Sequence, residues 1–327
     1  MQAIARVLLA ALTIGLTTLA LPSAAQAGKI RLGLVKFGTV NWEVAVIQKK
    51  GLAQAEGVDL EIVDLANNEA TKVAIQGGAV DMIVSDWLWV SRQRAEGHPL
   101  TFAPYSLTVG ALIARPDSGV KDLASLAGKR LGVAGGPIDK SWLLLRAYSR
   151  KTASKDIVDT LQPNFAAPPL LNELIGKGEL DAVLNFWHSA RLKAAGMKSI
   201  VEVSDILPAL GVKANPPLLG WVFDEAWAKQ NRATVEGFLR ASRKAKQLLK
   251  ESNEAWDAVK DLTKAENDNI LAALRGDYRA GIPEHFGNAE IEAAGQVFGI
   301  LAELGGEDLI GKSKVLSPGT FWEGYSY

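Results

Sequence analysis

The sequence predicts an α/β protein with two similar lobes that face each other across a cleft. One helix-to-strand pattern occurs twice, as IQGGAVDMIVSDW in residues 75–87 and IGKGELDAVLNFW in residues 175–187, at an offset of 100 residues. Strands also alternate with helices in both halves, which is typical of parallel sheets with right-handed crossovers. Two such units, each with loops at its strand ends, can clamp a ligand.

The first half is predicted to begin with strand, helix, strand, helix and strand in that order. Alternating β-rich residues indicate the first two strands, and an Asn67 or Asn68 cap indicates the start of the second helix. The predicted elements are a strand at 29–35, a helix at 42–50, a strand at 57–63, a helix at 67–77 and a strand at 80–85.

The second half repeats this order after the chain leaves the first lobe as extended chain beyond Pro99. We expect a strand at 130–134, helices near 140–150 and 170–175, and a strand at 182–185. The Asn-Pro-Pro turn at 215–217 precedes a returning strand at 218–223.

The chain therefore crosses twice between the lobes, near 108–116 and near 212–219. Two connections favour a hinge over a loose tether. We predict one lobe from 28–112 plus 218–327 and a second lobe from 113–217. Helical patterns fill the C-terminal third, and their apolar spacing predicts that they cover the first lobe's sheet. These helices are expected at 225–249, 254–262, 266–274 and 289–304.

Residues 1–27 are typical of a cleavable secretory signal peptide. Arg6 precedes an apolar run at 7–21, and Ala25-Gln26-Ala27 fits a cleavage site after Ala27. An uncleaved anchor is the alternative, but the apolar run is shorter than the roughly 20 residues of a membrane span. The mature chain is therefore expected to be periplasmic.

Composition limits the partners. Arg6 is the only charged residue among 1–27, so the mature chain carries 35 basic and 36 acidic side chains, which favours neither nucleic acid nor anionic lipid. The chain has no cysteine and three histidines, a poor supply for zinc; a hard ion such as calcium stays possible. We expect a monomer that needs no cofactor.

Three segments carry a family resemblance: the strand ending in Lys36-Phe37-Gly38, GGAVDMIVSD at 77–86, and VKDLASLAGKRLGVAGG at 120–136. With the signal peptide, they resemble periplasmic substrate-binding proteins of ATP-driven importers in the nitrate, sulfonate, taurine and thiamine-precursor group, over roughly residues 28–250. The resemblance implies a type II periplasmic-binding fold that closes on one small-molecule ligand. It also implies delivery to an ABC permease and its ATPase in the inner membrane.

A ligand is expected beyond the carboxyl ends of the strands, where loops lead into helix N-termini. Five loops meet this description, at 37–42, 67–71, 85–89, 134–141 and 185–188, and they contain aromatic, small and hydrogen-bonding residues. The candidate ligand-binding residues are Phe37, Thr39, Asn41, Trp42, Asn68, Glu69, Ser85, Asp86, Trp87, Gly135, Gly136, Asp139, Ser141, Asn185, Trp187 and His188.

Two features of these loops suggest how a ligand is held. Gly135 and Gly136 let the backbone approach a ligand closely, although a plain turn explains them too. Trp87 and Trp187 are equivalent in the repeat, so one from each lobe could close on a planar group. Trp42 and its counterpart Trp142 form a weaker pair, because both fall within helices and could only pack on the sheets.

Charge favours an aromatic, heterocyclic or amine-bearing ligand. Asp86 and Asp139 fall at predicted helix starts, and no arginine lies in the five loops. We expect such a ligand to stack on tryptophan and to bond Asp86, Asp139 and Asn185. Two alternatives remain: the carboxylates only cap helices, or a sulfonate, taurine or nitrate anion binds at helix N-termini with Lys36 or Lys140.

Other classes of protein fit less well. Relatives of this fold that make a thiamine pyrimidine carry a cysteine-rich motif, and this chain has no cysteine. No Gly-x-Ser-x-Gly elbow frames a nucleophile, and only His188 falls near the cleft, as a polar lid residue or a base. A ligand-sensing regulator would lack the export sequence. The sequence therefore predicts a binding protein without enzymatic activity.

Overall fold

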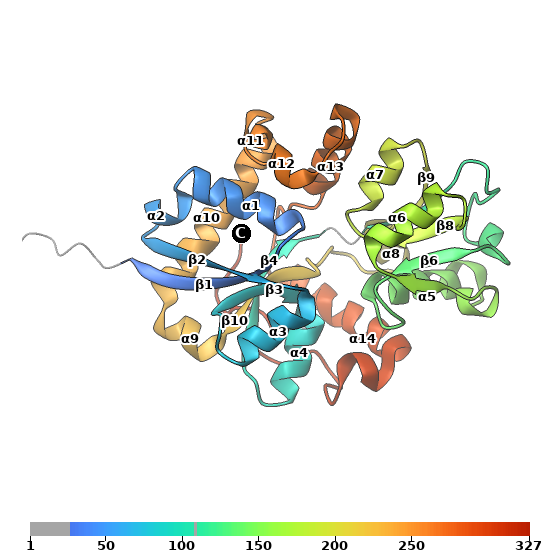
Figure 1. Cartoon of the computed structure of the whole chain (residues 1–327). Helices are drawn as coiled ribbons and strands as arrows, with labels where there is room; N and C mark the ends of the chain where they lie inside the picture. Colours follow the sequence, from blue (N-terminus) through green and yellow to red (C-terminus); the bar gives the residue numbers. More distant parts are fainter. Residues whose placement is uncertain (1–26, 108–109) are drawn as a thin grey trace, which may run out of the picture.

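The computed structural model describes residues 27–107 and 110–327, which form two lobes, each built on a five-stranded sheet with helices on its faces (Figure 1). Apart from Ala27, the predicted signal peptide lies outside the described residues. Across these residues, none of the helices has both the length and the apolar character that a membrane span needs.

The two sheets have the same strand order. In the first, β1 runs parallel to β2 and β3, and β10 runs antiparallel to β3 and β4, giving the order β2-β1-β3-β10-β4. In the second, β6 runs parallel to β7 and β8, and β5 runs antiparallel to β8 and β9, giving β7-β6-β8-β5-β9. The strands are β1 Gly28–Val35, β2 Val58–Leu65, β3 Met82–Asp86, β4 Leu100–Ser106, β5 Ala111–Ala114, β6 Leu131–Ala134, β7 Asn164–Ala166, β8 Ala182–Asn185, β9 Lys198–Glu202 and β10 Leu219–Asp224.

The sequence repeat corresponds to one helix and strand in each lobe, α3 with β3 and α6 with β8, and the predicted fold class is confirmed. The helices are α1 Thr39–Lys49, α2 Leu52–Ala55, α3 Asn68–Gln76, α4 Trp87–Ala95, α5 Lys140–Ala153, α6 Pro168–Gly176, α7 Ser189–Ala194, α8 Val203–Ala209, α9 Glu225–Gln230, α10 Arg232–Glu251, α11 Glu254–Asp257, α12 Lys260–Thr263, α13 Asp268–Ala280 and α14 Asn288–Ile310. Asn67 caps α3 through its side chain, which accepts a hydrogen bond from the Ala70 amide.

The chain passes between the lobes twice, from β4 to β5 and from α8 to β10. Residues 111 and 112, placed in the first lobe by the sequence, belong to β5 of the second sheet, where Ala111 pairs with Asn185 and Glu202. Extended chain alone does not reveal which sheet a strand joins, because the pairing partners decide it.

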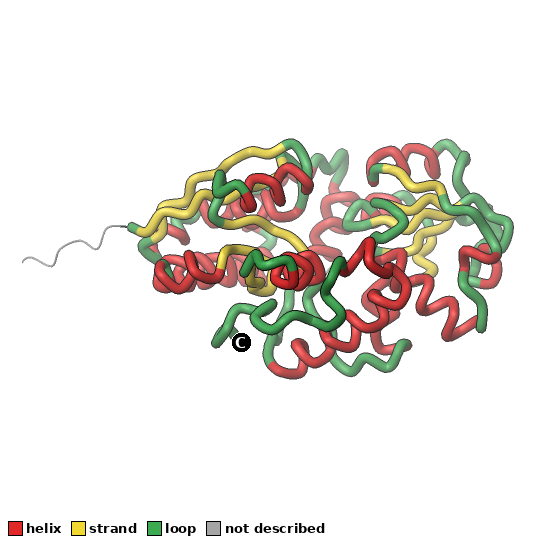
Figure 2. Tube along the Cα trace, turned by 90° about the horizontal axis from the view of Figure 1, so that it is seen from below, coloured by secondary structure: helices red, strands yellow, loops and turns green. Residues whose placement is uncertain are grey.

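The C-terminal helices do more than cover the first lobe. As predicted, α10 packs on α1 and β1, but α13 packs on α7 and α14 packs on α5, and both α5 and α7 belong to the second lobe (Figure 1). Figure 2 shows the strands in two separate groups with helical segments between them. The contacts of α13 and α14 with the second lobe were not predicted, since apolar periodicity shows that a helix has a packing face but does not show which element that face meets.

A buried ion pair crosses the core of the first lobe. Glu43 of α1 is fully buried and pairs with Lys246 of α10, whose pKa is lowered by burial and raised in part by Glu43. Ser242 and Tyr278 also donate hydrogen bonds to the Glu43 carboxylate. The pair and its hydrogen bonds thus link α1, α10 and α13.

Removing one partner of this pair is predicted to destabilise the protein strongly. Glu43→Ala should cost about 3–5 kcal/mol because Lys246 is left as an unpaired buried charge. The double change Glu43→Met with Lys246→Met should leave stability within about 2 kcal/mol of the starting protein, because similar volume is kept without buried charge. Thermal and urea denaturation would measure both, and equal effects for the two variants would contradict this account.

Candidate ligand-binding site

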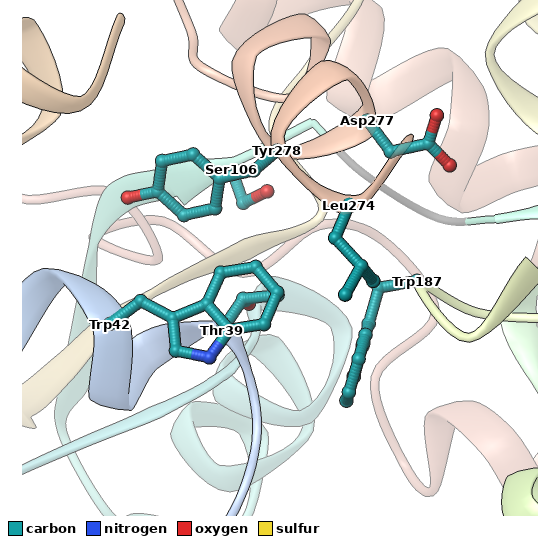
Figure 3. A pocket seen from close by; sticks show the side chains of 7 residues that line it. All are labelled: Thr39, Trp42, Ser106, Trp187, Leu274, Asp277 and Tyr278. Carbon is teal, nitrogen blue, oxygen red and sulfur yellow. The ribbon is translucent and has the colours of Figure 1, made fainter. Parts of the chain in front are cut away.

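A recess lies between the lobes at the contact of α7 with α13. It is lined by Thr39, Trp42, Ser106, Trp187, Leu274, Asp277 and Tyr278 (Figure 3). All of these belong to the first lobe except Trp187, which follows β8 of the second. With the lobes in this position the recess admits about one water molecule, so a larger ligand requires the lobes to separate.

Three aromatic rings form the walls of the recess. The ring of Trp42 lies 5.5 Å from that of Trp187 at 78° and 5.9 Å from that of Tyr278 at 47°. Polar atoms of two rings bond away from it: Trp42 Nε1 donates to the Leu262 carbonyl at 3.3 Å, and the Tyr278 hydroxyl donates to Glu43 at 3.1 Å. The fixed rings leave π-faces and edges to contact a ligand.

Polar groups complete the lining. Thr39 begins α1, and the Ser106 hydroxyl at the end of β4 donates to the Gly281 carbonyl at 3.3 Å. The Asp277 carboxylate lies at the rim and points away from Trp42 (Figure 3). It pairs with Lys193 of α7 at 3.0 Å, and burial raises its pKa despite that partner. Among the seven lining residues there is no lysine or arginine.

A second contact between the lobes joins the N-termini of two helices. Lys140 of α5 pairs with Asp86, at the end of β3, at 2.9 Å. Burial alone would raise the pKa of Asp86, but the charge and hydrogen bond of Lys140 outweigh it and the pKa falls below its usual range. The Asp86 side chain also caps α4 by accepting from the Trp89 amide at 2.9 Å.

Asp139 has the same capping role in the second lobe. Its carboxylate accepts from the amides of Ser141 at 2.9 Å and Trp142 at 3.3 Å. Burial raises the pKa of Asp139 to about 6, which Lys140 and the two amides counteract only in part. Gly135, with φ of 85°, makes the preceding turn, and a Cβ there would lie 3.2 Å from Asp139. This turn and cap account for Gly135 without a ligand.

The structure brings only some of the predicted residues together. Thr39, Trp42 and Trp187 meet in the recess, and Trp187 faces Trp42, not its sequence equivalent Trp87. Trp87 is fully buried, with its ring 6.2 Å from that of Phe321. The predicted Trp87–Trp187 clamp is therefore absent from this arrangement of the lobes.

Backbone conformation explains the difference. Trp87 is the first residue of α4 and enters the core, whereas Trp187 lies in a turn two residues before α7 begins. Two tryptophans that correspond in the repeat thus lie in different local structures, one at the start of a helix and the other in a turn.

Asn185 is buried and is bonded within its own lobe. Its Nδ2 donates to the Pro168 carbonyl at 3.1 Å and to Asn172 Oδ1 at 2.7 Å, and its Oδ1 accepts from the Phe186 amide at 2.9 Å. These bonds use both hydrogens of the side-chain amide and join the start of α6 to the end of β8. Asn185 is fully buried and does not line the recess, so its bond to a ligand stays a prediction.

The remaining candidates lie around the recess or away from it. The side-chain amide Nδ2 of Asn41 donates to the Val35 carbonyl at 3.0 Å, and Glu69 pairs with Lys72 on the surface of α3. Phe37 is 62% exposed, so its side chain stays free to cover a ligand. Outside the recess lining lie Phe37, Asn41, Asn68, Glu69, Ser85, Asp86, Trp87, Gly135, Gly136, Asp139, Ser141, Asn185 and His188.

His188 supports the wall of the recess. Its ring stacks on that of Trp187 with centroids 3.9 Å apart. Burial and the charge of Arg191 lower the pKa of His188 to about 4, so the ring is neutral near pH 7. A neutral stacked ring fits support of Trp187 better than charge recognition.

Four lining residues were not predicted from the sequence: Ser106, Leu274, Asp277 and Tyr278. Three of them lie on α13, which was predicted to end at 274 but continues to Ala280. Residues 274, 277 and 278 share one helical face by their spacing, but nothing local shows that this face meets the other lobe. Within the ranges that the structure describes, no group of three or more acidic, histidine or cysteine side chains could hold a metal ion.

The comparisons with known proteins agree with this geometry. The lobes, strand order and recess define the type II fold of periplasmic binding proteins. The alkanesulfonate-binding protein SsuA of Xanthomonas axonopodis pv. citri, bound to MOPS, superposes with a TM-score of 0.68 at 16% identity, over 91% of this chain and 99% of that chain. The periplasmic nitrate-binding protein NrtA of Synechocystis PCC 6803 gives 0.56 at 12% identity, over 74% and 67%.

A family match places the chain more closely. The family described as NMT1/THI5 like matches residues 42–255, more than half of the sequence, and the chain belongs to this family. A relative from Haemophilus influenzae, whose assigned name refers to thiamine biosynthesis, is 27% identical over 229 residues, which cover 66% of this chain and 67% of that protein. The family resemblance predicted from the sequence is confirmed.

The raised pKa of Asp139 predicts a stability that depends on pH. Since its folded pKa of about 6 exceeds the ordinary value near 3.9, the folded state binds more protons between these values, and stability falls as pH rises through this window. Asp139→Asn keeps a capping oxygen without the charge. It should therefore stabilise the protein at pH 7.5, by at most about 3 kcal/mol, and not at pH 3.5.

Thermal denaturation at the two pH values would measure this effect. Asp224→Asn, at the cap of α9, controls for exchanging aspartate for asparagine at a helix start. Destabilisation by Asp139→Asn at pH 7.5 would show that the charge is needed in the folded protein.

Arg191 is predicted to hold the lobes together. From α7 its guanidinium donates to the carbonyls of Thr263 at 2.8 Å and Lys264 at 2.7 Å and pairs with Glu266, all beyond the cleft in the first lobe. Arg191→Ala should shift the equilibrium towards open lobes by about 1.5–3 kcal/mol, seen as a larger radius of gyration in X-ray scattering. Arg240→Ala removes an ion pair within the first lobe and is the control; an equal change in both variants would contradict the prediction.

Proposed function

We propose that this protein is the periplasmic substrate-binding component of an ABC importer, capturing a small organic solute between its lobes by hinge closure and delivering it unchanged to a membrane permease. The observation that carries the proposal is a recess whose walls come from both lobes of a doubly connected chain. Because Trp187 and Trp42 lie on opposite lobes, a ligand between them favours the closed form, and only closure completes the site.

The chemistry of the recess favours an aromatic, heterocyclic or amine-bearing ligand. Three aromatic rings, Trp42, Trp187 and Tyr278, present surfaces suited to stacking or to a cation. The one charged side chain in the lining is a carboxylate, Asp277. In an open form, separation of Lys140 from Asp86 would leave a second carboxylate available to a ligand amine.

The lack of enzymatic activity, the periplasmic location and the monomeric state belong to the same proposal. The sequence supports export through its N-terminal segment, with cleavage after Ala27. The Haemophilus influenzae relative, by its name, raises a link to thiamine biosynthesis, but this chain has no cysteine for the motif of the pyrimidine-forming enzymes. Supply of a heterocyclic precursor by import satisfies both observations.

An anion is the second candidate ligand. Similar folds include proteins named as alkanesulfonate-binding and nitrate-binding, and Lys140 lies at the N-terminus of α5, where an anion is favoured. Against this, Asp86 already neutralises Lys140, and Asp139 already occupies the amides of that helix start. The aromatic lining therefore has the stronger support.

A set of three solutes that share one ring tests the ligand class: benzylammonium, benzyl alcohol and phenylmethanesulfonate, with aminopyrimidine, nitrate and ethanesulfonate alongside. We expect benzylammonium or aminopyrimidine to raise the melting temperature and change tryptophan fluorescence. Trp187→Ala should weaken that binding about tenfold, because one wall is lost.

Two outcomes would contradict the proposal. Tighter binding of nitrate or ethanesulfonate, unaffected by Trp187→Ala, would favour the anion. Detection of a chemically altered solute by mass spectrometry would show that the protein is an enzyme and not a binding protein. Trp322→Ala, in the C-terminal segment that packs on Phe223, is the control for losing any large indole.

A further inference from the structure

The ring of Tyr278 is held from behind by a carboxylate that does not line the recess. Tyr278 is buried apart from the part of its ring that lines the recess, and its hydroxyl donates to Glu43 Oε2 at 3.1 Å. Glu43 follows Trp42 directly in α1 and is fully buried. Glu43 therefore connects Tyr278, one aromatic wall of the recess, to α1, the helix that carries Trp42.

The position of Glu43 is itself fixed by two side chains of α10, Lys246 and Ser242. Lys246 of α10 pairs with it, and the Lys246 ammonium lies 4.0 Å from the centre of the Tyr105 ring on β4. The Ser242 hydroxyl donates to Glu43 and accepts from Trp221 Nε1 on β10 at 3.1 Å. The carboxylate is thus tied to the sheet and to α10.

Stability gives no reason for this pair to exist. Removing two charges from water carries a large desolvation cost. A protein with a well-packed apolar pair of similar volume at such a site is often as stable as one with the ion pair, or more stable. A hydrogen-bond acceptor in a fixed place, in contrast, is something that an apolar pair cannot provide.

An alternative partner for Tyr278 lies close by. The hydroxyl of Tyr105 is buried without a hydrogen-bond partner of normal geometry, and it interacts with the hydroxyls of Thr39 and Tyr278. Without Glu43, the neighbouring Tyr105 hydroxyl is the group left to satisfy the Tyr278 hydroxyl. The acceptor at position 43 thus determines which partner the Tyr278 hydroxyl takes.

We infer that Glu43, held by Lys246, is a positioning residue for the ligand site: it orients Tyr278 and the start of α1 so that Tyr278 and Trp42 present their rings to the recess. This rests on the proposed function, because it takes the recess as the ligand site. It goes beyond that function by assigning a determinant of affinity to residues outside the recess.

Three variants separate positioning from stability. The Met–Met variant, Glu43→Met with Lys246→Met, removes the acceptor and both charges. The Gln–Met variant, Glu43→Gln with Lys246→Met, removes the charges but keeps an amide oxygen that accepts from Tyr278. Tyr278→Phe removes only the donor. Ser91→Ala, which removes a buried hydroxyl bonded to Ser317 away from the recess, is the matched control.

The first measurement needs no ligand. In protein labelled with 6-fluorotryptophan, fluorine NMR reports the surroundings of Trp42, assigned through Trp42→Phe. We expect the Met–Met variant and Tyr278→Phe to shift the Trp42 resonance but not that of Trp322, and the Gln–Met variant to restore it. An unmoved resonance in the Met–Met variant, or no rescue by glutamine, would overturn the inference.

The second measurement is the affinity for benzylammonium by calorimetry. The Met–Met variant should bind about tenfold more weakly than the starting protein at similar melting temperature, as expected for losing one ordered hydrogen bond. Adding Tyr278→Phe to it should weaken binding no further, because both changes remove one interaction. Equal affinity in the Met–Met variant and the starting protein would refute the inference.

The two proposals fail in different ways. If no solute of the set binds the starting protein, the proposed ligand class fails, and the Trp42 resonance still decides the role of Glu43. If the Met–Met variant does not fold, the comparison of Tyr278→Phe with the Gln–Met variant decides it, because opposite effects on the resonance support the inference and equal effects refute it.

Discussion

The contact of α7 with the α12–α13 segment joins the two lobes and creates the recess. Trp187, Arg191 and Lys193 all lie in or next to α7, and each meets the first lobe by a different kind of interaction: ring packing, hydrogen bonds to carbonyls and an ion pair. Because the same short segment carries all three, lobe closure and formation of the aromatic wall are one event. A ligand that bridges the walls adds its binding energy to the closed form.

Charge in the cleft is distributed so that most of it is used by the protein itself. Lys140 neutralises Asp86, Lys193 neutralises Asp277, and Asp139 takes the amides at the start of α5. Because these charges are compensated within the protein, the groups left to contact a ligand are ring surfaces and hydroxyls. Opening of the lobes would add the charged groups of the ion pairs that it separates. An ion pair that spans the lobes also makes opening sensitive to salt and to protonation, since separated charges regain their solvation.

The first lobe holds its side of the recess through a buried carboxylate. Its central helices α1, α10 and α13 are fastened to each other by the buried carboxylate of Glu43, whereas the second lobe presents Trp187 from a turn. The two walls of the recess are therefore held differently, one through a buried hydrogen-bond network and the other from a turn. The C-terminal helix α14 contacts both lobes, since it packs on α4 of the first and on α5 of the second.

The sequence by itself determined the α/β class, the repeat, the strand and helix order within the repeated segments and the capping residues, because these depend on local periodicity and on side chains that bond their own helix starts. Asn67, Asp86 and Asp139 cap helices where the sequence placed helix starts. Thr39, Trp42 and Trp187 were also predicted for the site. Only the tertiary structure decided that Trp187 meets Trp42, that Trp87 enters the core, and that α13 supplies Leu274, Asp277 and Tyr278. These contacts join residues far apart in the chain across two lobes, and no local pattern encodes which face of one lobe comes to rest against the other.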